Sequence, residues 1–260
     1  MASDPDPMAK PLHGKTALVT GGGIGIGREI ALALATAGAR VAVTYHRHAP
    51  DDGFRTAVAA ASGHDAVCVE LDATVELEVQ RALTTVSDSA GELSILVNNV
   101  GGLVERNSIR EMDYSLWRDV VALNLDSMFL VTHHALRQFD FRDGRIINVA
   151  SLAGRNGGHA GATAYASTKA AVFGFTRGLA KELAPSGTTV NALAPGFIEG
   201  TPFHDTFTSD ESRAATIATI PMGRAGTPSD VASAAVWLAS PGAGFVSGTV
   251  IDINGAQYFG

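Results

Sequence analysis

Cysteine is nearly absent from this chain of 260 residues, which contains only Cys68. A single cysteine cannot form an intrachain disulfide, so the sequence is compatible with a reducing cytosol. Cys68 lies in the apolar run 66–69, and we interpret it as a buried small apolar residue rather than a redox group. A cytoplasmic protein is therefore expected.

Long apolar runs and an excess of basic charge are also missing. No window reaches the roughly 18 consecutive apolar residues of a membrane span. Residues 1–12 lack the apolar stretch of a signal peptide, and we interpret them as a flexible N-terminal tail. The formal charge is -7 with both signs intermixed, which favours neither a nucleic acid nor an anionic membrane as partner. The histidines are scattered, and the adjacent pair 133–134 cannot share a helix face, so no metal site is expected.

Short β-branched runs alternate with longer helical stretches from residue 13 to residue 260. Several of the runs are continuously apolar, which is typical of strands buried on both faces of a parallel sheet. The predicted strands are 16–20, 40–45, 66–70, 95–98, 145–150, 189–193 and 250–253, and the predicted helices are 25–37, 52–62, 75–90, 114–138, 164–183 and 228–239. The pattern predicts one α/β domain over 13–260, a Rossmann-type doubly wound sheet of seven mainly parallel strands flanked by helices.

Two details of this pattern can be tested against a structure. Thr74, and either Thr227 or Ser229, are expected to cap the helices that they precede. Residues 195–221 form the one irregular stretch, and its length is that of a lid over a site.

A glycine-rich turn links the first predicted strand to the first predicted helix, with the sequence Thr-Gly-Gly-Gly-Ile-Gly-Ile-Gly over residues 20–27. Glycines let the backbone approach a pyrophosphate, and a helix N-terminus offers unpaired N–H groups and partial positive charge to that anion. The alternative is a tight packing turn. The strand before it and the helix after it favour dinucleotide binding.

The spacing Thr-Gly-x-x-x-Gly-x-Gly resembles the fingerprint of the short-chain dehydrogenase/reductase family, and the resemblance runs from about Gly14 to Tyr258. It implies an oxidoreductase that interconverts a carbonyl and an alcohol with a nicotinamide dinucleotide. At the turn, it assigns cofactor binding to Gly21, Gly25, Ile26 and Gly27.

Four further residues match the catalytic set of the family. Tyr165 and Lys169 are four residues apart on a predicted helix and share one face, so the ammonium can lower the phenol pKa and make the tyrosine an acid/base. Ser151 follows the fifth strand, where its hydroxyl can bond the substrate oxygen. Asn124 lies in the middle of a long predicted helix, where the resemblance implies that it positions a proton-relay water.

The remaining cofactor contacts follow from the ends of other strands. Tyr45, His46 and Arg47 replace the acidic residue that would bind the ribose hydroxyls of NAD, so NADP(H) is preferred and NAD(H) remains possible. By resemblance, the adenine, nicotinamide and phosphate contacts are Asp72, Ala73, Asn98, Val100, Gly101, Tyr165, Lys169, Pro195, Gly196, Ile198 and Thr201. Val100 stands where the family usually has alanine, and Thr201 lies one residue later than the family's usual threonine.

The substrate is expected to be a small polar carbonyl or alcohol compound. Segments 101–104, 201–204 and 220–224 resemble bacterial reductases of the alginate-derived keto-uronate 4-deoxy-L-erythro-5-hexoseulose uronate, which form 2-keto-3-deoxygluconate. Candidate partners for a uronate carboxylate are Arg106, Arg155, His159 and His204, each of which is otherwise a surface group. A 3-oxoacyl carrier-protein reductase and a general sugar or alcohol dehydrogenase are the alternatives within the family. The sequence has no evident basic cluster for an acidic carrier protein.

Two other classes of protein are alternatives to an oxidoreductase of this family. A non-catalytic dinucleotide-binding sensor does not need the complete Asn-Ser-Tyr-Lys set, and an extended epimerase or dehydratase needs a longer C-terminal part. The resemblance also implies a homotetramer or homodimer, with candidate interfaces at residues 114–138, 164–183 and 245–259.

Overall fold

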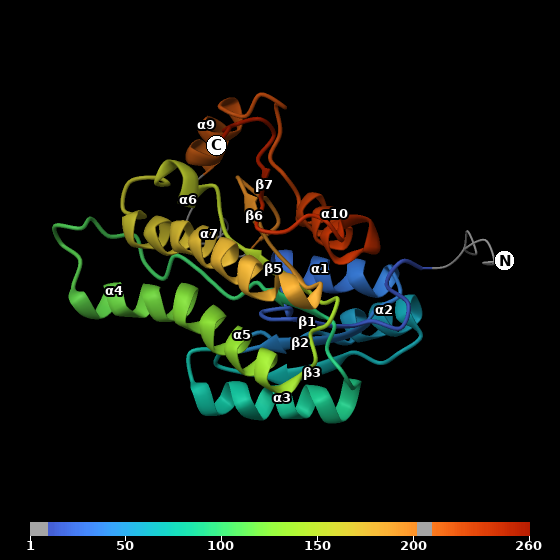
Figure 1. The fold of residues 1–260 in the computed structure, drawn as a ribbon. Helices are drawn as coiled ribbons and strands as arrows, with labels where there is room; N and C mark the ends of the chain where they lie inside the picture. Colours follow the sequence, from blue (N-terminus) through green and yellow to red (C-terminus); the bar gives the residue numbers. More distant parts are fainter. Residues whose placement is uncertain (1–9, 202–209) are drawn as a thin grey trace.

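Continuous apolar runs form the strands of one seven-stranded sheet, which helices cover on both faces (Figure 1). The computed structural model describes residues 10–201 and 210–260. The strands are β1 (Thr16–Val19), β2 (Arg40–Tyr45), β3 (Val67–Glu70), β4 (Ile95–Asn98), β5 (Arg145–Val149), β6 (Thr189–Pro195) and β7 (Val250–Ile253). Their order is β3-β2-β1-β4-β5-β6-β7, and every neighbouring pair is parallel. The predicted Rossmann-type sheet is confirmed.

Alternate residues of each strand face opposite helix layers, as the period of two in a strand requires. On one face, Ala17 and Val19 of β1 pack with α1 (Gly25–Thr36), α2 (Asp52–Ser62) and α10 (Pro228–Ala239). On the other face, Leu18 packs with α3 (Glu76–Ala90), α5 (Ser127–Gln138) and α7 (Thr163–Leu183). Burial on both faces explains why central strands such as β1 and β4 are mainly apolar.

The predicted helix over 114–138 is not continuous. It consists of α4 (Tyr114–Val121), a π-helical turn η1 (Ala122–Asp126) and α5. Such a turn inserts one extra residue into the hydrogen-bond ladder and is frequent at functional sites. The predicted catalytic residue Asn124 is at its centre.

Three further predictions need correction. The N-terminal tail does not reach residue 12, because Leu12 is buried in the core and its N–H donates to the Ala37 carbonyl. Cys68 is only partly buried, on the edge strand β3, and is a free thiol. Residues 195–221 are not wholly irregular, because β6 extends through Pro195 and α9 (Asp210–Ala218) follows. Residues 202–209 of that stretch lie outside the described residues.

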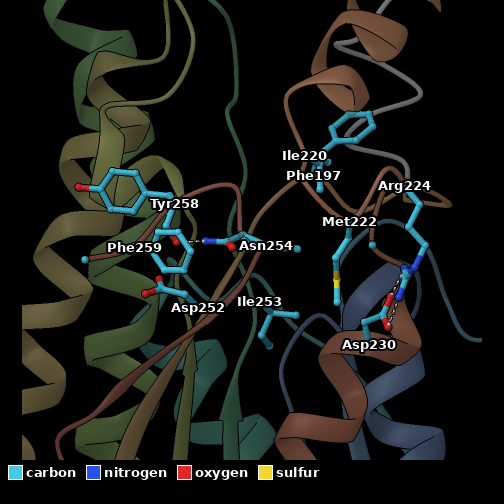
Figure 2. Close-up of a pocket in the computed structure, with 14 residues that line it drawn as sticks. Phe197, Ile220, Met222, Arg224, Asp230, Asp252, Ile253, Asn254, Tyr258 and Phe259 are labelled. Carbon is cyan, nitrogen blue, oxygen red and sulfur yellow. Dashed lines mark hydrogen bonds and ion pairs between the residues drawn. The ribbon is translucent and has the colours of Figure 1, made fainter.

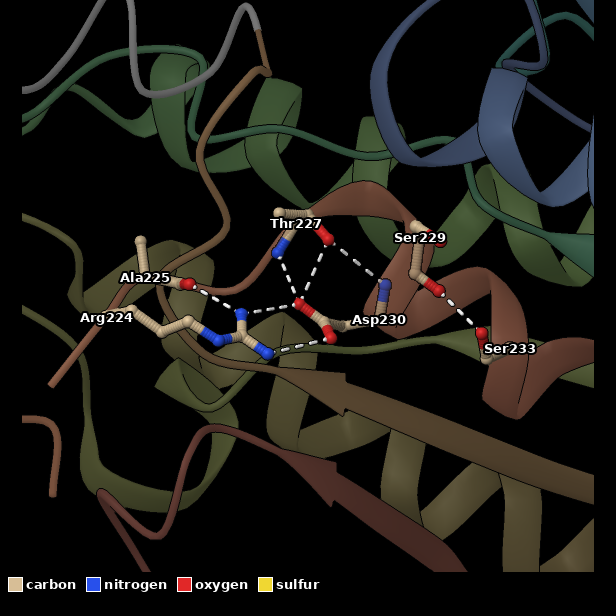
Figure 3. Close-up of polar contacts among 6 residues, drawn as sticks. All are labelled: Arg224, Ala225, Thr227, Ser229, Asp230 and Ser233. Carbon is tan, nitrogen blue, oxygen red and sulfur yellow. Dashed lines mark hydrogen bonds and ion pairs between the residues drawn. The ribbon is translucent and has the colours of Figure 1, made fainter. Parts of the chain in front are cut away.

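The capping prediction is correct at one helix and wrong at the other. Thr227 caps α10, with its hydroxyl accepting from the Asp230 N–H while the Asp230 carboxylate accepts from the Thr227 N–H (Figure 3). Ser229, the alternative, lies inside the helix, where its carbonyl accepts from the Ser233 hydroxyl. Thr74 does not cap α3, which begins after Val75, because the Thr74 hydroxyl donates to Asp72 instead.

Short helical segments complete the fold: α6 (Ala153–Asn156), η2 (Ala184–Ser186) and η3 (Pro241–Ala243). The sequence patterns did not predict α6, which begins two residues after Ser151. Within the described residues, no helix combines the length and the apolar character needed to cross a membrane.

Candidate active site

The glycine-rich turn lies at the carboxyl end of β1 and is fixed by the neighbouring strands. The Thr20 hydroxyl accepts from the Asn99 N–H at 3.0 Å, and the Asn99 amide donates to the carbonyls of Thr20 and Gly21. On the other side, the Gly22 N–H donates to the Thr44 carbonyl at 2.9 Å. Thr20, Asn99 and Thr44 were not among the predicted site residues. Thr20 begins the quoted glycine-rich sequence, and Asn99 lies between the predicted contacts Asn98 and Val100, but the sequence did not indicate that Thr20 and Asn99 bond to each other.

The turn has the geometry that a dinucleotide pyrophosphate requires. Gly25 has φ of +56°, a left-handed conformation that glycine adopts without steric cost. A side chain at Gly27 would place its Cβ 2.4 Å from both the Asn99 amide nitrogen and the Gly21 carbonyl oxygen. The N-cap of α1, Ile24, makes no side-chain capping bond. The first N–H groups of α1 therefore remain available to an anion, so the predicted Gly21, Gly25, Ile26 and Gly27 fit the phosphates.

The predicted adenosine contacts gather beside this turn. Tyr45 is half-buried at the end of β2, and His46 and Arg47 are exposed after it. Partial burial acts to raise the pKa of Asp72, but hydrogen bonds from Thr74 and, to a smaller extent, the neighbouring His46 and Arg47 hold this pKa below its usual range. The residues at the ends of β2 and β3 thus form one polar surface. Ala73, which is also a predicted contact, is buried.

The predicted contacts after β4 have different environments. The Asn98 amide donates to Asn148 and Thr132 in the interior, so its side chain joins β4 to β5 and α5. Val100 is half-buried, and its backbone N–H donates to the Thr20 hydroxyl at 3.3 Å. Gly101 is exposed at the edge of the sheet.

The predicted contacts after β6 lie beside the segment that carries Ser151. The Pro195 carbonyl accepts from the Leu152 N–H at 2.8 Å, and the Gly196 N–H donates to Ile253 at 2.9 Å. Ile198 and Thr201 are both buried. The Thr201 hydroxyl donates to the Ile198 carbonyl at 3.1 Å, so it would have to exchange that partner to donate to a phosphate.

Three of the predicted catalytic side chains come together at the ends of β5 and β4. Ser151 follows β5 and hydrogen-bonds the hydroxyl of Tyr165, which is half-buried on α7. Lys169, one turn further along α7, lies with its ammonium 5.7 Å from the centre of the Tyr165 ring and donates to the Val149 carbonyl at 2.9 Å. These contacts follow from the four-residue spacing on one helix face.

The pKa values of Tyr165 and Lys169 differ in one respect from what the sequence predicts. Burial raises the pKa of Tyr165 above its ordinary value, and the bond from Ser151 acts against that rise. Burial also lowers the pKa of Lys169 to about 8. The expected lowering of the phenol pKa by Lys169 is not found, because the ammonium lies near the ring and bonds a backbone carbonyl instead of the phenol oxygen.

Asn124 holds the loop after β4 next to Lys169. Its Oδ1 accepts from the Gly102 N–H at 3.0 Å, and its Nδ2 donates to the carbonyls of Gly102 and Val120 at 2.8 and 2.9 Å. These partners occupy the side chain, so a role in positioning a water stays a prediction. A Cβ at Gly101 would lie 2.7 Å from Asn124 Oδ1 and 2.8 Å from Lys169 Nζ, which places Gly101 between the two.

The loop after β4 also contains a strained residue. Val104 has φ of +64°, which is unfavourable for a β-branched side chain. The Glu105 N–H donates to the Leu103 carbonyl across Val104 at 2.8 Å, giving a tight three-residue turn. The Val104 side chain is 42% exposed. Strain of this kind persists where surrounding contacts enforce it, here the buried Leu103.

The four candidate partners for a substrate carboxylate are not equivalent. Arg106 and His159 are exposed on two loops that contact each other through a bond from Arg106 to the Ala160 carbonyl. Arg155 is paired with Asp252 and is unsuited to the predicted role. His204 lies outside the described residues.

A cavity of about 510 Å³ lies beside β7 and the C-terminal segment, and the predicted catalytic residues are not among those that line it (Figure 2). Its lining includes Phe197, Met222, Asp252, Asn254 and Tyr258. Figure 2 shows Arg224 and Asp230 at its border, joined by two hydrogen bonds of 2.8 and 3.1 Å. At that border, Arg224 and Asp230 are thus already paired with each other. Over residues 10–201 and 210–260, no cluster of three or more His, Cys, Asp or Glu side chains could hold a metal ion.

The position of Gly101 gives a first prediction. In Gly101→Ala the new methyl group would displace either the Lys169 ammonium or the Asn124 amide, so we expect kcat for carbonyl reduction to fall at least about tenfold. Gly102→Ala is the matched control, because its Cβ meets only a Leu123 methyl group at 3.6 Å. Equal steady-state kinetics for the two variants would contradict this geometry.

The buried lysine gives a second prediction, for stability. The pKa of Lys169 is about 8 when folded against 10.5 for a free lysine, so between these values the unfolded chain binds more protons. The free energy of unfolding should therefore rise with pH over that interval, by an amount of roughly 3 kcal/mol. Denaturant unfolding of Lys169→Met should lack this rise. Lys181→Met, exposed on the same helix, controls for the loss of a lysine; a rise retained in Lys169→Met would contradict the assignment.

Comparison with known proteins agrees with the geometry of this site. A family model described as "Enoyl-(Acyl carrier protein) reductase" matches residues 22–255. The chain is 41% identical to a 3-oxoacyl-[acyl-carrier-protein] reductase of Vibrio harveyi, over 95% of this chain and 98% of that protein. Its identity to the Escherichia coli enzyme of that name is 37%, with the same coverage.

Solved structures show the same similarity. A short-chain dehydrogenase/reductase described as glucose/ribitol dehydrogenase, from Brucella melitensis, superposes with a TM-score of 0.86 at 31% identity, covering 97% of this chain and 100% of that one. An NADH-dependent reductase responsible for alginate metabolism superposes with a TM-score of 0.86 at 29% identity, covering 96% and 99%. The chain thus belongs to the short-chain dehydrogenase/reductase family of NAD(P)H-dependent oxidoreductases.

Proposed function

We propose that this enzyme reduces the keto group of a 3-oxoacyl thioester, with NADPH as reductant and Tyr165 as proton donor. The observation that carries the proposal is the Tyr165 hydroxyl, which is bonded to Ser151 and lies one helical turn from the buried Lys169. The substrate class is supported by the Vibrio harveyi and Escherichia coli relatives, whose names specify a 3-oxoacyl group and whose lengths this chain matches.

Each side chain has a defined part in this reaction. The reduced dinucleotide, when bound, supplies the hydride that reaches the carbonyl carbon. The Ser151 hydroxyl donates to the carbonyl oxygen and stabilises the negative charge that develops there. Tyr165 then transfers its proton to that oxygen. Burial raises the pKa of this phenol, so its oxygen carries the proton before the reaction.

Lys169 lies near both the acid Tyr165 and the predicted cofactor contact Gly101. Its ammonium lies near the Tyr165 ring but bonds the Val149 carbonyl, so it places a positive charge beside the acid without lowering the phenol pKa. Because the pKa of Lys169 is about 8, the side chain is largely charged at pH 7 and loses this charge in mildly alkaline solution. The same ammonium is next to Gly101, a predicted contact of the cofactor.

A keto-uronate is the second candidate substrate. It is favoured by the structural similarity to the alginate-metabolism reductase and by two exposed groups, Arg106 and His159, on loops that flank the site. It is disfavoured by Arg155, a candidate carboxylate ligand that is instead paired with Asp252. A thioester needs no such ligand, so we rank it first.

The deciding measurement is the initial rate of NADPH oxidation with acetoacetyl-CoA, with an acetoacetyl carrier protein and with 4-deoxy-L-erythro-5-hexoseulose uronate. We expect the thioesters to be turned over with a higher kcat/KM than the uronate. Tyr165→Phe should lose turnover and keep NADPH binding, because only the acid is removed. A higher kcat/KM for the uronate would reverse the ranking. Absence of turnover with every carbonyl compound tested, in protein that binds NADPH, would favour a non-catalytic sensor.

The cofactor preference rests on Arg47 and His46, which supply positive charge where NAD-specific relatives carry a carboxylate. The NADH-dependent structural neighbour makes this a point to measure. We expect Arg47→Asp to raise KM for NADPH about tenfold or more and to lower KM for NADH, since a carboxylate repels a 2′-phosphate and bonds ribose hydroxyls. Arg55→Asp, exposed on α2, is the control for charge alone. An unchanged ratio of the two KM values would exclude the role of Arg47.

We further infer a cytoplasmic homotetramer or homodimer with a small-molecule substrate and with neither nucleic acid nor membrane as partner. Exposed aromatic side chains occur on two of the predicted interface segments, Tyr114 (75% exposed) and Phe129 on the helices, and Phe245 and Phe259 near the C-terminus. Such side chains are typical of surfaces that a partner covers. Sedimentation as a monomer would exclude the assembly.

A further inference from the structure

The short helix α6 is directly coupled to Ser151. The Ser151 Oγ accepts from the Ala153 N–H at 3.1 Å, and the Ser151 carbonyl accepts from the Gly154 N–H at 3.0 Å. A helix of four residues has no stability of its own, because its few internal bonds do not offset the cost of nucleation. The position of α6, and with it that of the Ser151 hydroxyl, therefore depends on contacts with the rest of the fold.

One of these contacts is with the helix that carries Tyr165 and Lys169. A Cβ at Gly154 would lie 2.7 Å from the Lys169 carbonyl carbon and 2.8 Å from the Ala170 nitrogen, so the two backbones touch. The contact is one turn away from Tyr165. Any tilt of α6 against α7 thus changes the separation between the Ser151 hydroxyl and the phenol.

The other contact is an ion pair that joins α6 to the last strand of the sheet. Arg155 Nε and Nη2 lie 3.2 and 3.3 Å from the two carboxylate oxygens of Asp252 on β7, and Nη2 lies 3.5 Å from the Val250 carbonyl. The guanidinium also lies over the Phe173 ring of α7, 4.8 Å from its centre. The two charged side chains are 14% and 20% exposed. A planar, two-point contact of this kind fixes orientation as well as distance.

We propose that Arg155 and Asp252 are positioning residues, which hold α6 so that Ser151 stays within hydrogen-bond distance of Tyr165. This inference rests on the catalytic roles given to Ser151 and Tyr165 under the proposed function. It gives Arg155 a task other than substrate binding, because Asp252, Val250 and Phe173 occupy its guanidinium on the protein side. Neither residue touches the reacting atoms.

The proposal has a consequence that a purely stabilising ion pair does not have. The hydrogen bond from Ser151 acts to lower the pKa of the Tyr165 phenol, against the effect of burial. If α6 shifts and this bond is lost, the phenol should titrate at higher pH. Loss of an ion pair that only stabilises the fold would lower the melting temperature and leave the titration of the folded enzyme unchanged.

The experiment compares Asp252→Asn and Arg155→Met with the wild-type enzyme in two ways. Kinetics with NADPH and the carbonyl compound that gives turnover should show kcat lowered by about ten- to a hundredfold, the effect of a small misplacement, and KM for NADPH changed less than about twofold. Ultraviolet titration of the folded proteins, taken as the difference from the same variant with Tyr165→Phe, should show the phenol pKa raised by about half a unit or more.

Arg224→Met is the matched control. It removes one partner of another two-point Arg–Asp contact, which lies at the start of α10 (Figure 3). We expect its phenol titration to equal that of the wild type. The double variant Arg155→Met/Asp252→Asn should match either single variant, because both residues act through one contact. Should Asp252→Asn not fold, Arg155→Lys keeps the charge and loses the two-point geometry, and should give a smaller shift in the same direction.

Two outcomes would overturn the proposal. One is an unshifted phenol titration in folded Asp252→Asn or Arg155→Lys, and the other is an equal shift in Arg224→Met. Failure of the proposed function is seen separately, as turnover retained by Tyr165→Phe in the otherwise wild-type enzyme. Loss of turnover in Tyr165→Phe, combined with an unshifted titration in Asp252→Asn, would leave the catalytic roles in place and remove only the positioning role.

Discussion

The parallel pairing of the strands is the constraint on which this site depends. Because all strands run the same way, every strand-to-helix turn emerges at one edge of the sheet. The strand order reverses between β1 and β4, and a crevice forms where successive connections leave in opposite directions. The glycine-rich turn lies at this point and is bonded across it, from Thr20 and Gly21 to Asn99. The residues that follow β5 and β6 lie along the same edge of the sheet.

Two features at that edge of the sheet lower the stability of the fold locally. The Lys169 ammonium is buried, which lowers its pKa, and Val104 is held in an unfavourable backbone conformation. Proteins maintain such features where a rigid surround enforces them. Here the surround includes a buried polar chain in which Asn98 donates to Asn148 and Asn148 donates to Thr176 of α7. This chain joins two central strands to the helix that carries Tyr165, so the helix cannot slide without breaking buried hydrogen bonds.

The long elements of the fold could be predicted from the sequence because each has its own periodic pattern. The strands at 40–45, 95–98 and 250–253 and the helix at 228–239 have the predicted bounds. The grouping of Ser151, Tyr165 and Lys169 could also be predicted from the sequence. Tyr165 and Lys169 lie one turn apart on a helix, and Ser151 follows the end of a strand.

The rest depends on contacts between distant residues, which leave no local pattern. α6 has four residues and no apolar face. The π-helical turn at Asn124 interrupts a helical stretch whose amino-acid composition is similar before and after the turn, so the sequence pattern did not predict it. Leu12 follows Pro11 in a polar segment, and only the structure shows that it packs into the core. Arg155 was only a candidate substrate ligand or surface group in the sequence, because the sequence does not reveal its partner, Asp252, which is 97 residues away.

That separation also bears on the order of events when the chain is made. A domain folds as a unit, and contacts between residues far apart in the sequence form slowly. The ion pair that anchors α6 cannot form before residue 252 has been synthesised. A chain shortened before β7 would therefore contain Ser151 and Tyr165 and lack the contact that joins α6 to the sheet.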